Sequence, residues 1–167
     1  GRSIIAETFV DDVLDVLGRE DVRPEHLGIE ITETAFMSNM AEASRGIAAL
    51  SEQGIQIYLD DFGTGYSSLY YLHTMPIASL KIDKSFIDGI NAPLNASNEL
   101  VKTVLTLASG LGMATVAEGV ETREQIDFLA ENGCSAIQGY IFSQALSGSD
   151  FATYLKGSAE SIAAVMA

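Results

Sequence analysis

The sequence has few basic residues, one cysteine and no long apolar run, and each shortage excludes a class of protein. Its 9 Lys and Arg residues face 23 Asp and Glu residues, for a net charge of −14, so no basic surface is available for a nucleic-acid polymer. Cys134 is the single cysteine, which excludes an internal disulfide and zinc sites built on cysteine pairs. No apolar run approaches the roughly 18 residues of a membrane span. We therefore expect a cytoplasmic protein without membrane contact.

What the sequence does contain is an alternation of short apolar runs with segments of helical period. Its 167 residues, 47% of them hydrophobic, fit one globular domain. Apolar residues at three- and four-residue steps predict amphipathic helices that end near Gly18 and Gly112, and Thr122 with Gln125 predicts the capped start of another. The apolar runs predict five strands, at residues 27–31, 55–59, 79–82, 115–118 and 136–142. Such alternation predicts an α/β fold with a parallel sheet.

Polar side chains stand at the end of every predicted strand. Parallel sheets place their ligand sites beyond the carboxyl ends of the strands. Carboxylates gathered at one edge repel one another unless a cation neutralises them, and oxygen ligands without clustered Cys or His favour Mg²⁺ or Mn²⁺. We therefore expect a divalent metal site, with two metals as the usual device for phosphodiester displacement. The residues at this edge are Glu30, Glu33, Asp60, Asp61, Lys81, Asp83, Glu118, Glu121 and Gln138.

Each of these groups also has a purely structural interpretation. An acidic pair such as Asp60 and Asp61 before Gly63 is common in a solvated turn, and the metal interpretation gains its weight from the polar groups at all five strand ends. Lys81, taken alone, favours a salt bridge to the acidic edge over a catalytic role. The two histidines are isolated in the sequence and are interpreted as surface or hydrogen-bonded residues.

Five segments of the chain resemble, in order and spacing, the EAL family of cyclic di-GMP phosphodiesterases. The segments are IEITE, LDDFGTGYSSL, LKIDKSF, VAEGVET followed by Gln125, and QGYIFS, and the resemblance runs from about residue 1 to about residue 150. It implies a modified TIM barrel that binds cyclic di-GMP across the carboxyl ends of its strands. It also implies hydrolysis of one phosphodiester to linear pGpG, with Mg²⁺ or Mn²⁺.

The resemblance assigns roles to individual residues. Glu30 resembles a ligand of the first metal, Asp60 the carboxylate that bridges both metals, and Asp61 and Glu118 ligands of the second. These four residues are the metal ligands that we expect.

Four further residues match positions that support the reaction in the family. Lys81 resembles the lysine that contacts the nucleophilic water, and Gln138 the glutamine that supports it. Glu33 is similar to the glutamate that anchors the loop from Phe62 to Ser68, and Glu121 matches the second acid of the EGVE motif. In the family this loop couples dimerisation to metal binding, which implies a homodimer.

The sequence departs from the family pattern at its start and at two later positions. The Glu-Ala-Leu signature and the strand with the metal-binding asparagine are not in the sequence, so we expect one partial domain over residues 1–167, with about five of eight strands. Ala145 stands where the family often has proline, and Lys84 where arginine is commoner. An open sheet edge also favours pairing with another chain. We expect fusion to, or regulation by, sensory domains.

Two other functions stay open at this point. The chain is alternatively an inactive EAL module that binds cyclic di-GMP or a protein partner. A flavodoxin-like receiver domain, with Mg²⁺ beside a phosphorylated aspartate, also has five strands and an acidic pair. Against the receiver, Lys81 is followed by Ile82 rather than by the proline usual there.

Overall fold

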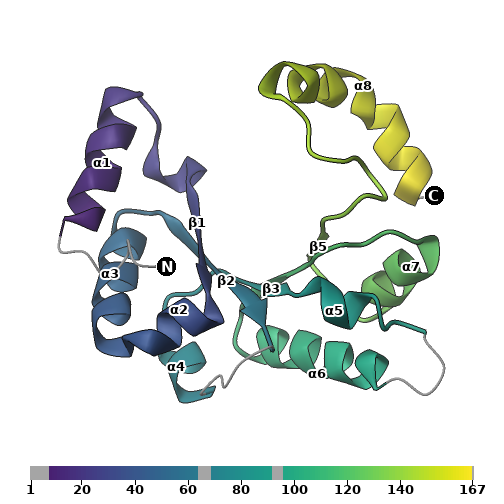
Figure 1. Ribbon diagram of the computed structural model, residues 1–167, viewed down its shortest axis with the longest axis horizontal. Coiled ribbons are helices and arrows are strands. Elements are labelled where there is room, and N and C mark those ends of the chain that lie inside the picture. Colours follow the sequence, from purple (N-terminus) through teal and green to yellow (C-terminus); the bar gives the residue numbers. More distant parts are fainter. Residues whose placement is uncertain (1–7, 64–68, 92–95, 167) are drawn as a thin grey trace.

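The computed structural model describes residues 8–63, 69–91 and 96–166, which form an α/β fold around one parallel sheet (Figure 1). All neighbouring strands are parallel, and their order in the sheet follows the chain. The strands are β1 (Gly28–Thr32), β2 (Gln56–Phe62), β3 (Ser79–Ile82), β4 (Ala114–Ala117) and β5 (Ala136–Ile137).

Helices connect these strands, as the sequence predicts. Figure 1 shows α1, in purple, near β1, whereas α8, in yellow, stands beyond β5 at the other end of the sheet. The helices are α1 (Phe9–Arg19), the 3₁₀ turn η1 (Pro24–His26), α2 (Glu33–Ser38), α3 (Met40–Glu52), α4 (Leu69–Thr74), α5 (Lys84–Ile87), α6 (Ser97–Gly110), α7 (Arg123–Glu131) and α8 (Gly148–Met166).

The strand order separates the two folds that the sequence left open. A flavodoxin-like sheet has the order 2-1-3-4-5, with a reversal beside its first strand. The sheet here has the order β1-β2-β3-β4-β5 without a reversal, so the receiver-domain hypothesis is wrong. Parallel strands that follow one another around a sheet, with a helix after each, form the wall of a TIM-type barrel. The predicted barrel-type α/β fold is confirmed.

Alternation along the strands divides the sheet into a core face and a site face. Ile57 and Leu59 of β2 are buried in the main core cluster, which Leu80 of the adjacent β3 also joins. Because successive side chains of a strand point to opposite faces, Asp60 and Lys81 share the other face. The apolar residues therefore fix the register that brings the two charged ones together.

Several predicted element ends differ from the structure. The strand β2 runs to Phe62 rather than ending at residue 59, and two of the other differences have a local cause. The last strand ends at Ile137 rather than at residue 142. Beyond it, Gln138 O accepts a hydrogen bond from Val120 N, and Ile141 N donates to Val120 O, so the chain wraps around Val120. Gly139 is required at the crossing, since a Cβ there would lie 2.0 Å from Val120 O.

The first helix also runs past its predicted end. Gly18 lies inside α1, which ends at Arg19, and the left-handed position that follows is Asp21, with φ 52°. By contrast, Gly112 follows α6 in the left-handed conformation, with φ 71°. Thr122 and Gln125 form the predicted capping box of α7. The capping box thus predicted its helix end correctly, whereas glycine marked the helix end at Gly112 and not at Gly18.

Candidate active site and metal centre

Three carboxylates from three strands converge on the Lys81 ammonium group. Its Nζ lies 2.8 Å from Glu30 Oε2 at β1, 3.1 Å from Asp60 Oδ1 on β2 and 2.6 Å from Glu118 Oε1 just after β4. The Lys81 side chain is 7% exposed, because β3 runs between β2 and β4. These four residues form the Lys81 cluster, and they include three of the four predicted metal ligands.

The carboxylates hold Lys81 in its charged form. Burial by itself disfavours a positive charge and lowers the pKa of Lys81. The interactions with Glu118, Glu30 and Asp60 act in the opposite direction and outweigh it, so the pKa is raised above 10.5. These interactions therefore favour the ammonium form of Lys81 at the centre of an acidic edge.

The Asp pair stands at a break in the strand ladder. The register between β2 and β3 shifts between Leu59 and Phe62, and Asp61 takes a left-handed φ of 55°. Gly63 follows with φ 97°, as expected for a glycine that frees the backbone after the pair. The second expected glycine, Gly65, lies outside the described residues.

Asp61 belongs to the same electrostatic environment as the Lys81 cluster. Its pKa is raised by burial, next by the adjacent Asp60 charge and then by Asp83, while Lys81 lowers it to a smaller extent. Burial and the neighbouring carboxylates thus both disfavour the charged form of Asp61.

Glu33 ties the start of α2 to the end of β2. It is 1% exposed, and its Oε2 accepts a hydrogen bond of 3.1 Å from Gly63 N. Its Oε1 is buried and meets no hydrogen-bond donor within the described chain. The contact is at the first residues of the predicted anchored loop, whose residues 64–68 lie outside the description. The predicted anchoring role of Glu33 stays a prediction.

Glu121 lies apart from the Lys81 cluster, in a second group of charges. Lys84 Nζ is 2.7 Å from Glu121 Oε1 and 2.9 Å from Asp88 Oδ1, and it also donates to Gly119 O at 3.4 Å. The Lys84 side chain is 45% exposed. These residues, Lys84, Asp88 and Glu121, form the Lys84 cluster. The strand-end pattern does not predict this pairing, but the spacing of three residues that Lys81 and Lys84 share with Glu118 and Glu121 is a sequence signal for it.

Gln125 fixes the backbone that carries Glu121. Its Oε1 accepts hydrogen bonds from the backbone nitrogens of Glu121 and Thr122, at 2.8 and 3.0 Å, and its Nε2 donates to Ile87 O at 3.1 Å. The side chain is 8% exposed. One buried amide therefore joins α7, the turn after β4 and the end of α5.

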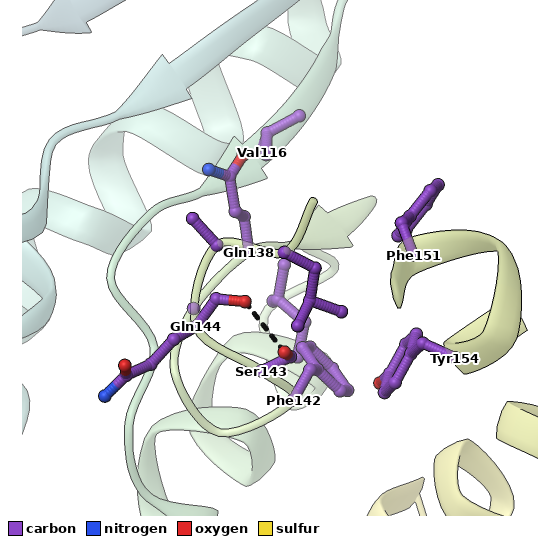
Figure 2. Close-up of a pocket in the computed structure, with 11 residues that line it drawn as sticks. Val116, Gln138, Phe142, Ser143, Gln144, Phe151 and Tyr154 are labelled. Carbon is purple, nitrogen blue, oxygen red and sulfur yellow. Dashed lines mark hydrogen bonds between the residues drawn. The ribbon is translucent and has the colours of Figure 1, made fainter. Parts of the chain in front are cut away.

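Gln138 lines a largely apolar pocket of about 520 Å³. Figure 2 shows Phe151 and Tyr154 extending from α8 on one side, with Val116, Gln138 and Phe142 on the other. Gln138 is exposed and also borders a second pocket beside Glu118 and Glu121. The remaining residues around the first pocket are Ile137, Gly139, Ser143, Gln144, Ala145 and Leu146.

The donor chemistry of the Lys81 cluster fits a hard divalent cation, because Glu30, Asp60 and Glu118 present carboxylate oxygens around one positive atom. That atom is the lysine nitrogen. Within the residues that the structure describes, no group of three His, Cys, Asp or Glu side chains is arranged to hold a metal ion. The carboxylates are therefore of the chemical type that binds a divalent metal, but their oxygens contact Lys81.

Comparisons with known proteins identify the family of the chain. The family model described as EAL domain matches residues 1–145. The cyclic di-GMP phosphodiesterase NbdA of Pseudomonas aeruginosa is 41% identical over 139 residues, which cover 83% of this chain and 18% of NbdA. The first curated relatives are thus matched over about a fifth of their length.

Solved structures show the same likeness. The PaMucR phosphodiesterase in complex with c-di-GMP has a TM-score of 0.86 and 36% identity, covering 90% of this chain and 61% of that one. BlrP1 of Klebsiella pneumoniae, in a manganese and cyclic di-GMP complex, has a TM-score of 0.76 and 31% identity, covering 83% of this chain and 35% of that one.

The fold is of the TIM-barrel type, with a parallel sheet. Its site is an acidic strand edge around one buried lysine. The chain is a member of the EAL domain family. Within the described residues no helix is both long and apolar enough to cross a membrane.

Proposed function

We propose that the site performs divalent-metal-dependent hydrolysis of cyclic di-GMP to linear pGpG. The observation that carries the proposal is the convergence of Glu30, Asp60 and Glu118 on Lys81 at the carboxyl edge of the sheet. Family membership supports it, as do relatives named for this substrate and solved as complexes with it.

The metal ligands in this proposal are Glu30, Asp60, Asp61 and Glu118. BlrP1 structures with manganese and with calcium support a divalent ion at such a site. A bound Mg²⁺ or Mn²⁺ supplies Lewis-acid polarisation of the phosphoryl group and lowers the pKa of bound water. It also answers the charge problem, because a net charge of −14 repels a ligand with two phosphates.

The remaining residues have orienting roles in the proposal. Lys81 holds the attacking water near the scissile phosphorus, where a permanent ammonium stabilises the developing negative charge. Gln138 supports that water, Glu33 fixes the loop after the Asp pair, and Glu121 has a supporting role. Water adds to one phosphorus, and the ribose oxygen that leaves takes up a proton, so one phosphodiester becomes a terminal phosphate.

A chromatographic assay for pGpG tests the reaction. The purified protein, incubated with cyclic di-GMP, should form pGpG in Mg²⁺ or Mn²⁺ and none in EDTA. Ca²⁺ is larger and less demanding in geometry, and we expect it to inhibit. Product formed at an undiminished rate in EDTA would eliminate a metal mechanism.

Calorimetric titration with Mn²⁺ tests the ligands separately from the chemistry. Asp60→Asn should lower Mn²⁺ affinity by about 100-fold or more, because it removes the carboxylate predicted to bridge both metals. Asp88→Asn is the matched control, since Asp88 pairs with Lys84 outside the Lys81 cluster. Equal Mn²⁺ binding by both variants would contradict the assignment.

A second candidate function is a cyclic di-GMP receptor that does not cleave its ligand. One observation favours it: the three carboxylates already have a cationic partner in Lys81. Binding of cyclic di-GMP without pGpG formation in any metal would select this function over the first.

We also propose that the protein is a cytoplasmic homodimer and that sensory domains regulate it. Exposed apolar side chains that follow β5 in the chain, among them Tyr140 at 67% and Leu155 at 54%, support self-association. A clean monomer in light scattering at micromolar concentration would contradict the dimer.

A further inference from the structure

One ammonium group and the proposed metals compete for the same oxygens. Glu30, Asp60 and Glu118 are the carboxylates assigned to the metals, and each places an oxygen within 3.1 Å of Lys81 Nζ. These are the separations of ion pairs and hydrogen bonds. Mg²⁺ demands oxygen ligands at about 2.0–2.1 Å in a near-octahedral arrangement. The three carboxylate oxygens are therefore positioned to bind the lysine ammonium.

The two kinds of cation compete at this short range. An ammonium and a divalent ion that share a carboxylate repel each other, and the repulsion is strongest where the surroundings screen charge least. The Lys81 side chain is 7% exposed, against 20% for Asp60 and Glu118 and 51% for Glu30, so screening is weakest at the ammonium itself. A metal that enters must therefore take oxygens from Lys81 and move its Nζ away.

We propose that Lys81 is the resident counter-cation of the site, which holds the three carboxylates together without metal and lowers the affinity for metal. Metal uptake and withdrawal of the Lys81 ammonium are then one exchange. This role goes beyond contact with the attacking water and rests on the proposed function for the identity of the ligands. It makes Lys81 a positioning residue for the metal-free site as well.

The fold suits Lys81 to such an exchange. Its backbone is fixed on both sides, since Leu80 pairs with Leu59 and Lys81 itself with Val116 in the parallel ladder. The four-carbon stem of lysine is flexible, and its ammonium is a point charge that can contact several partners without a fixed geometry. Rotation about the side-chain bonds would therefore move the ammonium while the sheet stays in place.

Lys81→Met tests the proposal, because methionine is unbranched and of similar length but carries no charge. In Mn²⁺ calorimetry we expect the variant to bind about tenfold more tightly than the unmodified protein, which is the loss of one competing cation. Thermal unfolding should show a lower Tm without metal and a larger rise in Tm with Mn²⁺. Lys84→Met is the control, as it removes the same charge from a neighbouring cluster, and it should leave Mn²⁺ affinity within about twofold.

The outcomes are separable. Unchanged or weaker Mn²⁺ affinity in a folded Lys81→Met overturns the proposal, and so does an equal gain in Lys84→Met. A variant that folds in Mn²⁺ alone supports it, because the metal then replaces the missing cation. If the variant folds in neither condition, carbon-13 lysine spectra of the unmodified protein decide: the assigned Lys81 side-chain signal must shift with Mg²⁺, and a signal that stays in place overturns the proposal.

The same data distinguish this inference from the proposed function. Tighter Mn²⁺ binding by Lys81→Met in a protein that never forms pGpG would contradict the phosphodiesterase and leave the counter-cation in place. Metal-dependent pGpG formation together with unchanged affinity in Lys81→Met would do the reverse.

Discussion

Two lysines three residues apart, Lys81 and Lys84, pair with two glutamates that are also three residues apart. The Lys81–Glu118 distance is 2.6 Å and the Lys84–Glu121 distance is 2.7 Å, so geometry alone hardly separates them. Their surroundings do. The Lys81 side chain is 7% exposed and gathers carboxylates from three strands, whereas Lys84 is 45% exposed on a short helix.

The difference shows that burial, not distance, decides what an ion pair does. An exposed pair contributes about 0–1 kcal/mol, because water already solvates both charges. Removing one partner of a buried pair costs about 3–5 kcal/mol, because it leaves an uncompensated charge. In the Lys81 cluster the ammonium is buried while its carboxylate partners are 20–51% exposed, so the cost of removing Lys81 lies between these two cases. In the Lys84 cluster both partners are about half exposed, and the cost is that of an exposed pair.

Replacing each lysine by alanine should expose this contrast most strongly. Lys81→Ala should lower kcat by about 10²–10⁴-fold with a much smaller change in KM, since a group that acts on the attacking water matters mainly in the transition state. Lys84→Ala should lower kcat by less than about tenfold. Steady-state kinetics on both variants, with circular dichroism to verify folding, make the measurement. Similar losses of kcat in the two variants would remove the functional distinction between the clusters.

The sequence predicted the Lys81 cluster well, because the apolar periodicity and the positions of the charged residues agree there. Apolar alternation placed Asp60 and Lys81 near strand ends, and parallel strands bring their ends to one edge. Lys81 taken alone indicated a salt bridge, and the structure shows ion pairs to three carboxylates. Its catalytic role came from the family resemblance and stays a prediction.

Three other features were less predictable, because each depends on a local backbone conformation. Asp61 takes a left-handed conformation that a sequence usually signals with glycine, and it is not a glycine. The early end of β5 depends on how closely Gly139 passes Val120. The pocket between β5 and α8 depends on the placement of a helix after a long connection, where no ladder fixes the register (Figures 1 and 2).

Removing the Gln125 side chain should loosen the Lys84 cluster and leave the Lys81 cluster in place. Gln125→Ala deletes hydrogen bonds to Glu121 N, Thr122 N and Ile87 O in a buried position. We expect a loss of about 2–4 kcal/mol in the free energy of unfolding, measured in urea. Glu124→Ala, at the adjacent exposed position, should change it by about 0.5 kcal/mol or less. A matching loss of Mn²⁺ affinity in Gln125→Ala would show that the clusters are coupled.

A methyl group at Gly119 probes the contact between the turn after β4 and the Lys84 stem. Gly119 has φ 68°, and a Cβ there would lie 2.4 Å from Lys84 Cγ and 2.8 Å from Lys84 Cβ. Gly119→Ala should cost about 1–2 kcal/mol in thermal unfolding, through backbone strain and this clash. Adding Lys84→Ala removes the Cγ contact and leaves the Cβ contact, so part of the cost should return. A cost that is identical in both backgrounds would assign all of it to the backbone.

The smallest expected effect is at Asp83, which stands between the two lysines and caps α5. Asp83 Oδ1 accepts hydrogen bonds from Ser85 Oγ and, at 3.0 Å, from Ser85 N, and these bonds lower its pKa below 3.8. A carboxyl whose pKa is lower in the folded state stabilises the fold above its unfolded pKa, and this stability disappears as the pH falls through the folded value.

Asp83→Asn should therefore remove a small acid dependence and keep the cap, because asparagine is an equally good N-cap. Above pH 5 the variant should lose about 1 kcal/mol or less in the free energy of unfolding, since a partly exposed charge is well screened. Below pH 3.8 its stability should approach that of the unmodified protein, since Asp83 is then becoming protonated. Urea unfolding across pH 2.5–6 makes the comparison. A difference that stays constant over this range would mean that the charge of Asp83 contributes nothing, and that hydrogen-bond geometry alone caps the helix between the two clusters.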